Sequence, residues 1–130
     1  MANRLATIRR AAAQAQSYRC YYCSSPIWEG DPKAFCSARN VRPRQAALLR
    51  STAEHLHARC DGGGNLRSNI VAACWYCNHT RHTAAVPKSP SAYLQHVRHR
   101  MQKGRWLTAL VITQSPPGHS PAQECVASAA

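Results

Sequence analysis

Two pairs of cysteines have the spacing of metal ligands. Cys20 and Cys23 form one C-x-x-C motif, and Cys74 and Cys77 form a second one. Two residues between the cysteines allow one tight turn to present both sulfurs to one ion, and two such turns complete the tetrahedron that Zn²⁺ prefers. Four thiolates leave no open coordination position, so the pattern predicts a structural zinc site. The pairs are separated by 50 residues, so a folded segment must lie between them.

The cysteines also have another interpretation, as buried or redox-active thiols. A single C-x-x-C motif would leave that choice open, whereas two motifs in a chain without a secretory signal favour zinc. Cys36 and Cys60 could substitute as ligands, but we expect both to be small buried hydrophobic residues. Cys125 lies near the C-terminus, and we expect its thiol to be free.

Residues 52–82 contain a second set of side chains that could do chemistry. Asn78 and His82 are four residues apart on a predicted helix, so they share one face. Glu54 belongs to a predicted strand that a glycine-rich loop returns to the side of this helix. A carboxylate, an amide oxygen and an imidazole form an incomplete ligand set, which suits Mg²⁺, Mn²⁺ or another divalent ion that keeps waters and accepts a substrate phosphate. A free histidine nearby could then deprotonate water.

Each of these residues has a plainer interpretation when it is taken alone. His82 could be a solvated helix residue, Glu54 a surface charge and Asn78 a helix cap. Strand alternation also places His55 and His57 on one face and Glu54 on the other. Glu54 can therefore join a site with His55 only where the strand begins or bends.

Three stretches taken together have the order and spacing of a known family. They are E-H-L-H at 54–57, G-G-G at 62–64 and N-I-V-A-A-C-W-Y-C-N-H-T-R-H at 69–82. With the cysteine pairs, the pattern over residues 20–82 resembles the HNH endonuclease family of the ββα-metal (His-Me finger) type. The intervals from His55 to Asn69 and from Asn69 to Asn78 are similar to those of the HNH domain in CRISPR effector nucleases. The helix pair Asn78 and His82 resembles the two helix ligands of colicin-type nucleases.

The resemblance implies a role for each polar residue of the pattern. His55 takes the position of the general base, and Asn69 that of the asparagine that holds the loop and orients the base. The resemblance implies that Glu54, Asn78 and His82 bind the catalytic divalent ion, Mg²⁺ or Mn²⁺. The products it implies carry a 5′-phosphate and a 3′-hydroxyl.

The charge of the chain indicates an anionic partner. Lysine and arginine number 17 against 5 aspartates and glutamates, a formal net charge of +12. This excess favours nucleic acid, with DNA the expected partner, although an anionic surface or simple solubility would also account for it. Arginine predominates, and its planar fork matches phosphate oxygens. Arg59, Arg67 and Arg81 are expected to contact phosphates, and the family resemblance implies the same role for His57.

The sequence has no stretch of about 18 apolar residues that would cross a membrane. We expect no membrane partner and, because no secretory signal is evident, a cytoplasmic location. The basic residues 1–19 mimic a transit peptide, but a basic helix explains them equally well.

The predicted elements define an α+β fold. We expect helices at 3–16, 43–50, 75–85 and 91–103, with strands near 35–37, 52–58 and 70–73. The resemblance implies a small ββα-metal core, a two-stranded antiparallel hairpin plus a helix, stapled by a four-cysteine zinc site and flanked by helices. The expected organisation is a basic N-terminal helix (1–19), a zinc-knuckle HNH nuclease domain (20–86), a basic helix with an apolar segment (87–112) and a disordered tail (113–130).

The sequence therefore predicts a metal-dependent endonuclease that hydrolyses DNA by a single-metal mechanism. The alternative is a non-catalytic zinc-knuckle nucleic-acid-binding protein. That alternative needs the four cysteines and the arginines, but not the ordered set of five polar residues. A redox or metal sensor that uses the C-x-x-C motifs is a weaker alternative.

Overall fold

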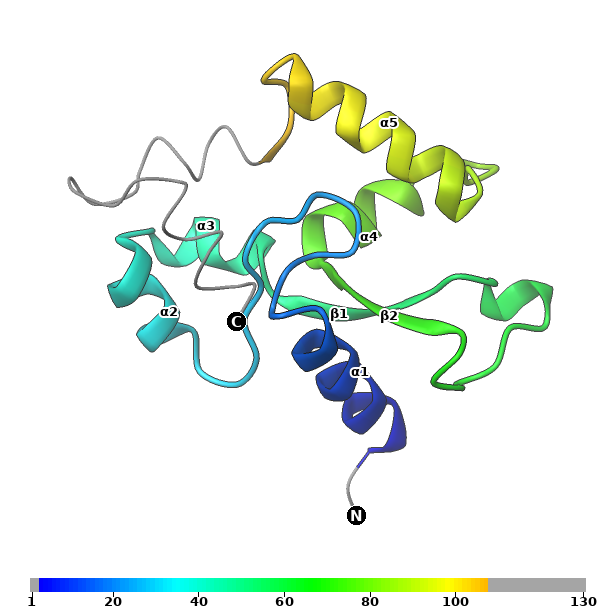
Figure 1. Cartoon of the computed structure of the whole chain (residues 1–130), viewed down its shortest axis with the longest axis horizontal. Helices are drawn as coiled ribbons and strands as arrows, with labels where there is room; N and C mark the ends of the chain where they lie inside the picture. Colours follow the sequence, from blue (N-terminus) through cyan, green and yellow to red (C-terminus); the bar gives the residue numbers. More distant parts are fainter. Residues whose placement is uncertain (1–2, 108–130) are drawn as a thin grey trace.

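An antiparallel hairpin lies at the centre of the computed structural model, which describes residues 3–107 (Figure 1). Strand β1 (Ser51–His55) pairs with β2 (Ile70–Cys74), with Ser51 opposite Cys74 and His55 opposite Ile70. The other elements are α1 (Arg4–Ala15), α2 (Pro32–Arg39), α3 (Pro43–Leu48), the 3₁₀ turn η1 (Arg59–Asp61), α4 (Trp75–Arg81) and α5 (Pro90–Gln102). The predicted α+β class and the ββα unit of hairpin and following helix are confirmed.

Helix α1 packs along one face of the hairpin and α4 along the other (Figure 1). Asn3 caps α1 by accepting a hydrogen bond from the amide of Leu5, and Ile8 and Ala13 are buried. The Gln16 side chain bonds both backbone groups of Ala72, donating at 2.8 Å and accepting at 2.9 Å. It thereby satisfies polar groups at the edge of β2 that the hairpin leaves unpaired.

Helix α2 occupies the segment where a short strand was predicted, and that prediction is wrong. Asp31 accepts a hydrogen bond from the amide of Lys33, and Pro32 occupies the first turn, so the local start signal is that of a helix. Asn40 ends α2 in the left-handed conformation with φ of 53°. Helix α3 begins at Pro43 as predicted but ends at Leu48.

Strand β1 and helix α4 are shorter than predicted, whereas β2 extends one residue further, to Cys74. β1 ends at His55, and the amide of Leu56 still bonds the carbonyl of Asn69 before the chain enters the loop. α4 ends at Arg81, so His82 is its C-cap rather than an interior residue. His82 therefore lies at the open end of the helix.

Helix α5 lies over α4 (Figure 1). Ser89 caps it rather than Ser91, and Tyr93 and Val97 are its buried residues. Gly104 follows its C-cap with φ of 65°, a conformation that glycine adopts without steric cost. The expected tail (113–130), most of the apolar segment before it and Cys125 lie outside the described residues.

None of the helices within residues 3–107 has the length and apolarity needed to cross a membrane.

Candidate functional site

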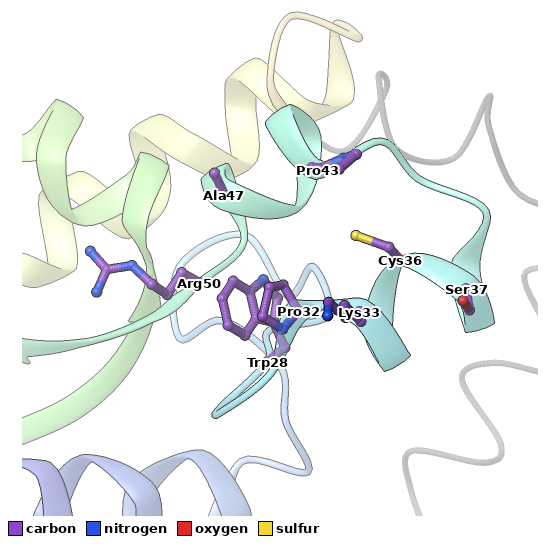
Figure 2. Close-up of a pocket in the computed structure, with 8 residues that line it drawn as sticks. All are labelled: Trp28, Pro32, Lys33, Cys36, Ser37, Pro43, Ala47 and Arg50. Carbon is purple, nitrogen blue, oxygen red and sulfur yellow. The ribbon is translucent and has the colours of Figure 1, made fainter.

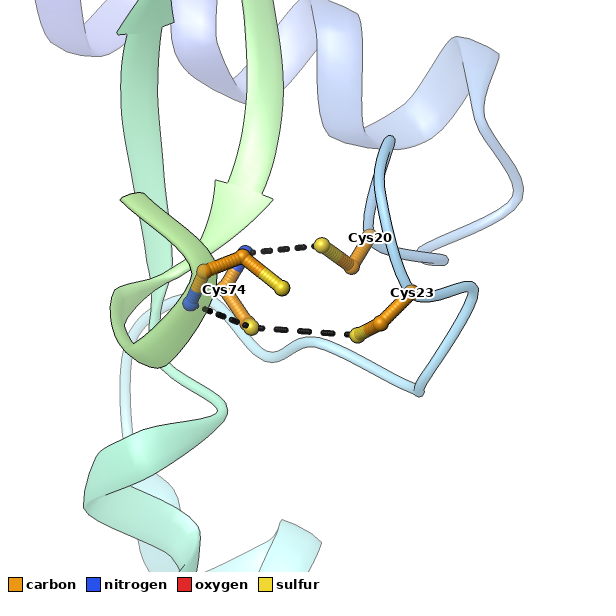
Figure 3. Close-up of side chains that lie close together, drawn as sticks. Cys20, Cys23 and Cys74 are labelled. Atoms are coloured by element: carbon orange, nitrogen blue, oxygen red, sulfur yellow. Dashed lines mark hydrogen bonds between the residues drawn. The ribbon is translucent and has the colours of Figure 1, made fainter. Parts of the chain in front are cut away.

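The four predicted zinc ligands converge at one end of the hairpin. Cys20 and Cys23 lie on the loop after α1, and Cys74 ends β2 (Figure 3). Cys77 is in the first turn of α4. All four are buried, and their sulfurs lie within 4.8 Å of one another. The Cys23 and Cys74 sulfurs are 3.9 Å apart, close to the separation of about 3.8 Å between sulfurs in a tetrahedron with Zn–S bonds of about 2.3 Å. This cluster could therefore hold a zinc ion.

Donors around the cluster favour thiolates. The amide of Cys74 donates to the sulfur of Cys20 at 3.2 Å, and the amide of Cys77 donates to the sulfur of Cys74 at 3.3 Å. Burial opposes ionisation of Cys20, yet hydrogen bonds with the other three thiols lower the pKa of Cys20 well below its ordinary value. Hydrogen bonding to Cys20 is in turn the largest cause that raises the pKa values of Cys74 and Cys77. All four side chains can therefore be thiolates at once only where a cation neutralises them.

Helix α5 and the residues after it cover the cluster. The indole of Trp106 donates to the sulfur of Cys77 at 3.4 Å, and the hydroxyl of Tyr93 donates to the carbonyl of Cys77 at 2.7 Å. Tyr93 also packs edge-to-face on Tyr22, which lies between Cys20 and Cys23. Helix α5 is thus fastened to the four-cysteine cluster as well as to the apolar core.

A buried carboxylate is the centre of the second group. Glu54 is 1% exposed, and its Oε1 lies 3.1 Å from Nε2 of His82. The other oxygen, Oε2, accepts a hydrogen bond from the hydroxyl of Tyr22 at 3.2 Å and pairs with Arg81 at 3.2 Å. Each oxygen therefore has a different set of partners. The imidazole of His82 is partly exposed, whereas the Glu54 side chain that it contacts is buried.

Asn78 also lies on α4, and it contacts β1 beside Glu54. Its Nδ2 donates to Oγ1 of Thr52 at 3.1 Å and to the carbonyl of Ala53 at 3.3 Å. Both donor hydrogens are then used on β1, which leaves Oδ1 as the atom able to bind a cation. A carboxylate oxygen, an imidazole nitrogen and an amide oxygen are thus available where α4 crosses β1.

His55 has a different partner, in the hairpin loop. Its Nε2 lies 2.8 Å from Oδ1 of Asn65, whereas Glu54 turns toward α4, as strand alternation requires. Among residues 3–107, the four cysteines form the only group of three or more His, Cys, Asp or Glu side chains with ligand atoms within 4.8 Å of one another. The imidazole of His55 is therefore not part of the group formed by Glu54 and His82.

Asn69 closes the loop that carries Asn65. Its Oδ1 accepts from the amide of His57 at 2.7 Å, and its Nδ2 donates to the carbonyls of His57 and Gly64, each at 3.0 Å. Gly63 lies so close to this turn that a Cβ there would run into the backbone carbonyl of His57. The G-G-G sequence thus allows a close backbone approach that fixes the residues after His55.

The expected phosphate contacts divide into two groups. His57, Arg59 and Arg67 are exposed on the hairpin loop. Arg81 is only 5% exposed, and its side chain bonds Glu54 and the carbonyls of His55 and Lys88. The burial of Arg81 argues against the expected phosphate contact, because protein acceptors already enclose its guanidinium.

Two of the remaining cysteines differ from the expectation of burial. Cys60 is exposed in η1, and Cys36 is only partly buried in α2. Neither lies within the four-cysteine cluster. Cys36 packs against the edge of the core and stays partly exposed, whereas Cys60 is a surface residue.

Sequence reasoning missed three residues that contact the site. Tyr22 reaches Glu54 from the first cysteine knuckle, Asn65 reaches His55 from the loop, and Thr52 accepts from Asn78. The position of Thr52, two residues before Glu54 on one strand face, was a usable signal. Tyr22 had none, because its contact spans 32 residues of sequence.

The fold and the site together define a small ββα domain with a four-cysteine cluster that could bind zinc, and with carboxylate, amide and imidazole groups where the hairpin meets its helix. A family model described as HNH endonuclease matches residues 39–84, which include the hairpin, its loop and α4. The match confirms the resemblance and indicates a nuclease-type function for this part of the chain. No curated protein and no solved structure shows a significant match.

Proposed function

We propose that this protein is a metal-dependent endonuclease that hydrolyses phosphodiester bonds of DNA, with His55 as the general base. The observation that supports the proposal most directly is the contact of Glu54 Oε1 with His82 Nε2 at 3.1 Å. Glu54 directly precedes His55, whose imidazole is held by Asn65 of the hairpin loop. The family match over residues 39–84 supports the same reaction class.

Glu54, Asn78 and His82 would hold one divalent ion, Mg²⁺ or Mn²⁺. Their oxygen and nitrogen donors suit such an ion, which would neutralise charge on the scissile phosphate and on the leaving 3′ oxygen. Tyr22 and Arg81 occupy Oε2 of Glu54, so they orient Oε1 toward His82. Burial is the largest cause that raises the pKa of Tyr22, and the Glu54 carboxylate raises it further. The phenol therefore remains a hydrogen-bond donor at physiological pH.

His55 would take a proton from the attacking water. Oδ1 of Asn65 accepts from Nε2–H of His55 in the tautomer that satisfies their contact at 2.8 Å, which leaves Nδ1 with its lone pair free. Asn65 is then the residue that orients the base, and Asn69 maintains the loop that presents Asn65. Holding the loop is one of the two roles that the family resemblance implies for Asn69.

DNA would be held by the positive charge of the chain. The net charge of +12 and the exposed Arg59 and Arg67 beside the loop favour contacts with phosphates on either side of the cut. Such contacts carry no sequence information by themselves. We therefore propose weak sequence preference.

Plasmid cleavage in the presence of Mg²⁺ or Mn²⁺ tests this function. His55→Ala should lower the rate by at least about 100-fold, because the base is lost, while DNA affinity changes little. His82→Ala should require more Mn²⁺ for half-maximal activity. His55→Ala should bind the divalent ion as tightly as the unaltered protein does. Cleavage by His55→Ala at the rate of the unaltered protein, with contaminating nuclease excluded, would refute the assignment of the base.

One observation favours a second candidate function, a non-catalytic nucleic-acid-binding protein. Arg81 and Tyr22 already satisfy part of the buried Glu54 carboxylate, an arrangement that a purely structural ion pair would also have. In that case DNA binds but is not cut under any divalent ion, and Glu54→Gln changes stability alone. The plasmid assay therefore separates the two candidates.

A further inference from the structure

A pocket lies away from the candidate site, where α2 and α3 meet the beginning of β1. Its volume is about 700 Å³, within the range of about 300–1,000 Å³ found for ligand sites. Figure 2 shows Trp28 in the pocket, with Pro32 and Cys36 from α2 and Ala47 from α3. None of the residues assigned above to zinc, to the divalent ion or to the base lines it.

The ring of Trp28 is fixed in place. Its Nε1 donates to the carbonyl of Ala46 at 2.7 Å, and its backbone carbonyl accepts from the amide of Ser51 at 3.0 Å. The polar atom of the indole is therefore satisfied within the protein. The ring therefore presents an apolar aromatic surface to the pocket. Such a surface suits a planar aromatic ligand.

The charges that line the pocket are both positive. Lys33 and Arg50 are exposed at its rim, and no carboxylate in the described part of the chain forms an ion pair with either of them. Apolar aromatic walls with unpaired cations at the edge fit a ligand with a planar ring system joined to an anion. A nucleotide has this chemistry, with a base for Trp28 and phosphates for the two cations.

Arg50 connects the pocket to the candidate site. It directly precedes β1, and strand alternation places Arg50, Thr52 and Glu54 on the same face. At about 3.3 Å per residue, Arg50 lies about 13 Å from Glu54, which corresponds to about four stacked nucleotides of one strand. One strand could therefore have a phosphate at the site and a base in the pocket.

We propose that this pocket binds an unpaired nucleobase of the DNA strand that the site cuts, with Lys33 and Arg50 on its flanking phosphates. The inference rests on the proposed DNA substrate and narrows it to DNA with an unstacked or single-stranded base near the cut. A base paired inside a duplex cannot reach the pocket, so substrates with a gap, a flap or a single strand should bind best.

The test measures the part of the binding that depends on bases. Fluorescence anisotropy compares a single-stranded thymidine 12-mer with an abasic 12-mer of equal charge, both bound to zinc-loaded His55→Ala protein. We expect the thymidine strand to bind at least about fivefold more tightly, the lower end of what one stacked base contributes. Ala47→Phe, which fills the pocket from α3, should bring this ratio close to one.

Two further variants control for folding and for charge. Ser37→Phe fills the pocket from α2 and should have the same effect if Ala47→Phe does not fold. Arg44→Gln removes an exposed charge of α3 that does not line the pocket, and it should leave the ratio of the two affinities unchanged. Melting temperature and zinc content identify variants that are misfolded.

Several outcomes would overturn the proposal. One is a ratio of the thymidine and abasic affinities near one for the parent protein, and another is a raised ratio that persists in both filled variants. A third is a mononucleotide that binds the pocket as tightly as the thymidine strand does. Plasmid cleavage by the unaltered protein is measured in parallel. If plasmid is cut but the two affinities are equal, only the proposed nucleobase pocket is rejected. If the affinities differ and depend on the pocket but no plasmid is cut, the nuclease function is rejected and the nucleobase pocket stands.

Discussion

At the scale of single residues, two donors hold the carboxylate of Glu54 by the same oxygen. Arg81 and Tyr22 both contact Oε2, so the carboxylate cannot rotate freely, and Oε1 faces His82. Partners of this kind set the orientation of a metal ligand without touching the metal, and their loss commonly lowers metal affinity by about 10- to 100-fold.

Tyr22→Phe tests this positioning role. The variant keeps the ring and loses the hydroxyl, so we expect half-maximal cleavage to need about tenfold more Mn²⁺, with a loss of about 1 kcal/mol in the free energy of unfolding. Metal titration of plasmid cleavage and urea denaturation measure the two effects. Tyr21→Phe is the matched control, since Tyr21 is more exposed and should titrate like the parent. Equal titration curves for the two variants would argue that Tyr22 only packs.

At the scale of elements, the loop between the strands determines where His55 and Asn65 meet. Asn69 bonds backbone groups on both sides of the loop, and Gly63 passes close to the carbonyl of His57. The loop is therefore held by backbone contacts rather than by an apolar core of its own. Its shape should be sensitive to a single added methyl group.

Gly63→Ala should displace this loop, because the new Cβ would overlap the His57 carbonyl. Cleavage should fall by about tenfold or more, since a misplaced base loses its alignment with water, while zinc content stays unchanged. Gly64→Ala is the matched control, because its Cβ would meet only the Leu66 side chain, at 3.8 Å. Similar activity for the two variants would indicate that the loop adapts.

At the scale of the whole molecule, the cysteine cluster joins segments that are distant in sequence. It connects the loop after α1 with the end of β2 and the start of α4, and Trp106 contacts it from beyond α5. Tyr22, between two of the ligands, carries the same connection to Glu54. Loss of a zinc ion bound by this cluster should therefore affect the core and the candidate site together.

Cys20→Ser should unfold or aggregate the protein, because zinc binding energy contributes directly to folding in small sites of this kind. Elemental analysis should find one zinc per chain, and a strong chelator should lower the melting temperature. Cys60→Ser is the control, since Cys60 is exposed and outside the cluster. Folded protein that contains no zinc would contradict the structural role.

The excess of arginine should govern affinity for DNA. Binding should weaken steeply as salt rises, because cations that contact phosphates displace condensed counterions. A plot of the logarithm of the affinity against that of the salt concentration measures the number of contacts. Arg59→Gln and Arg67→Gln should each reduce the slope by about one unit, whereas Arg44→Gln, away from the loop, should not. A flat salt dependence would exclude phosphate contacts as the source of affinity.

The sequence alone determined the features that depend on local spacing. Two residues between cysteines define a ligand turn, so Cys20, Cys23, Cys74 and Cys77 could be paired before any fold was known. The hairpin, the helix after it and the glycine loop followed from periodicity and turn residues in the same way. The error at α2 was also local, because the capping signal of Asp31 and Pro32 was overlooked in favour of a strand near Phe35.

Only the tertiary structure decided which side chains meet. Helical periodicity does not reveal that Arg81 turns inward to Glu54 and away from solvent, nor that Tyr22 reaches Glu54 across 32 residues. The same holds for Asn65 beside His55 and for the pocket around Trp28, which three separate segments enclose. The physical reason is that spacing constrains neighbours within a turn or strand, whereas contacts between distant segments depend on how the elements pack around the hairpin and on the polar groups that this packing must satisfy.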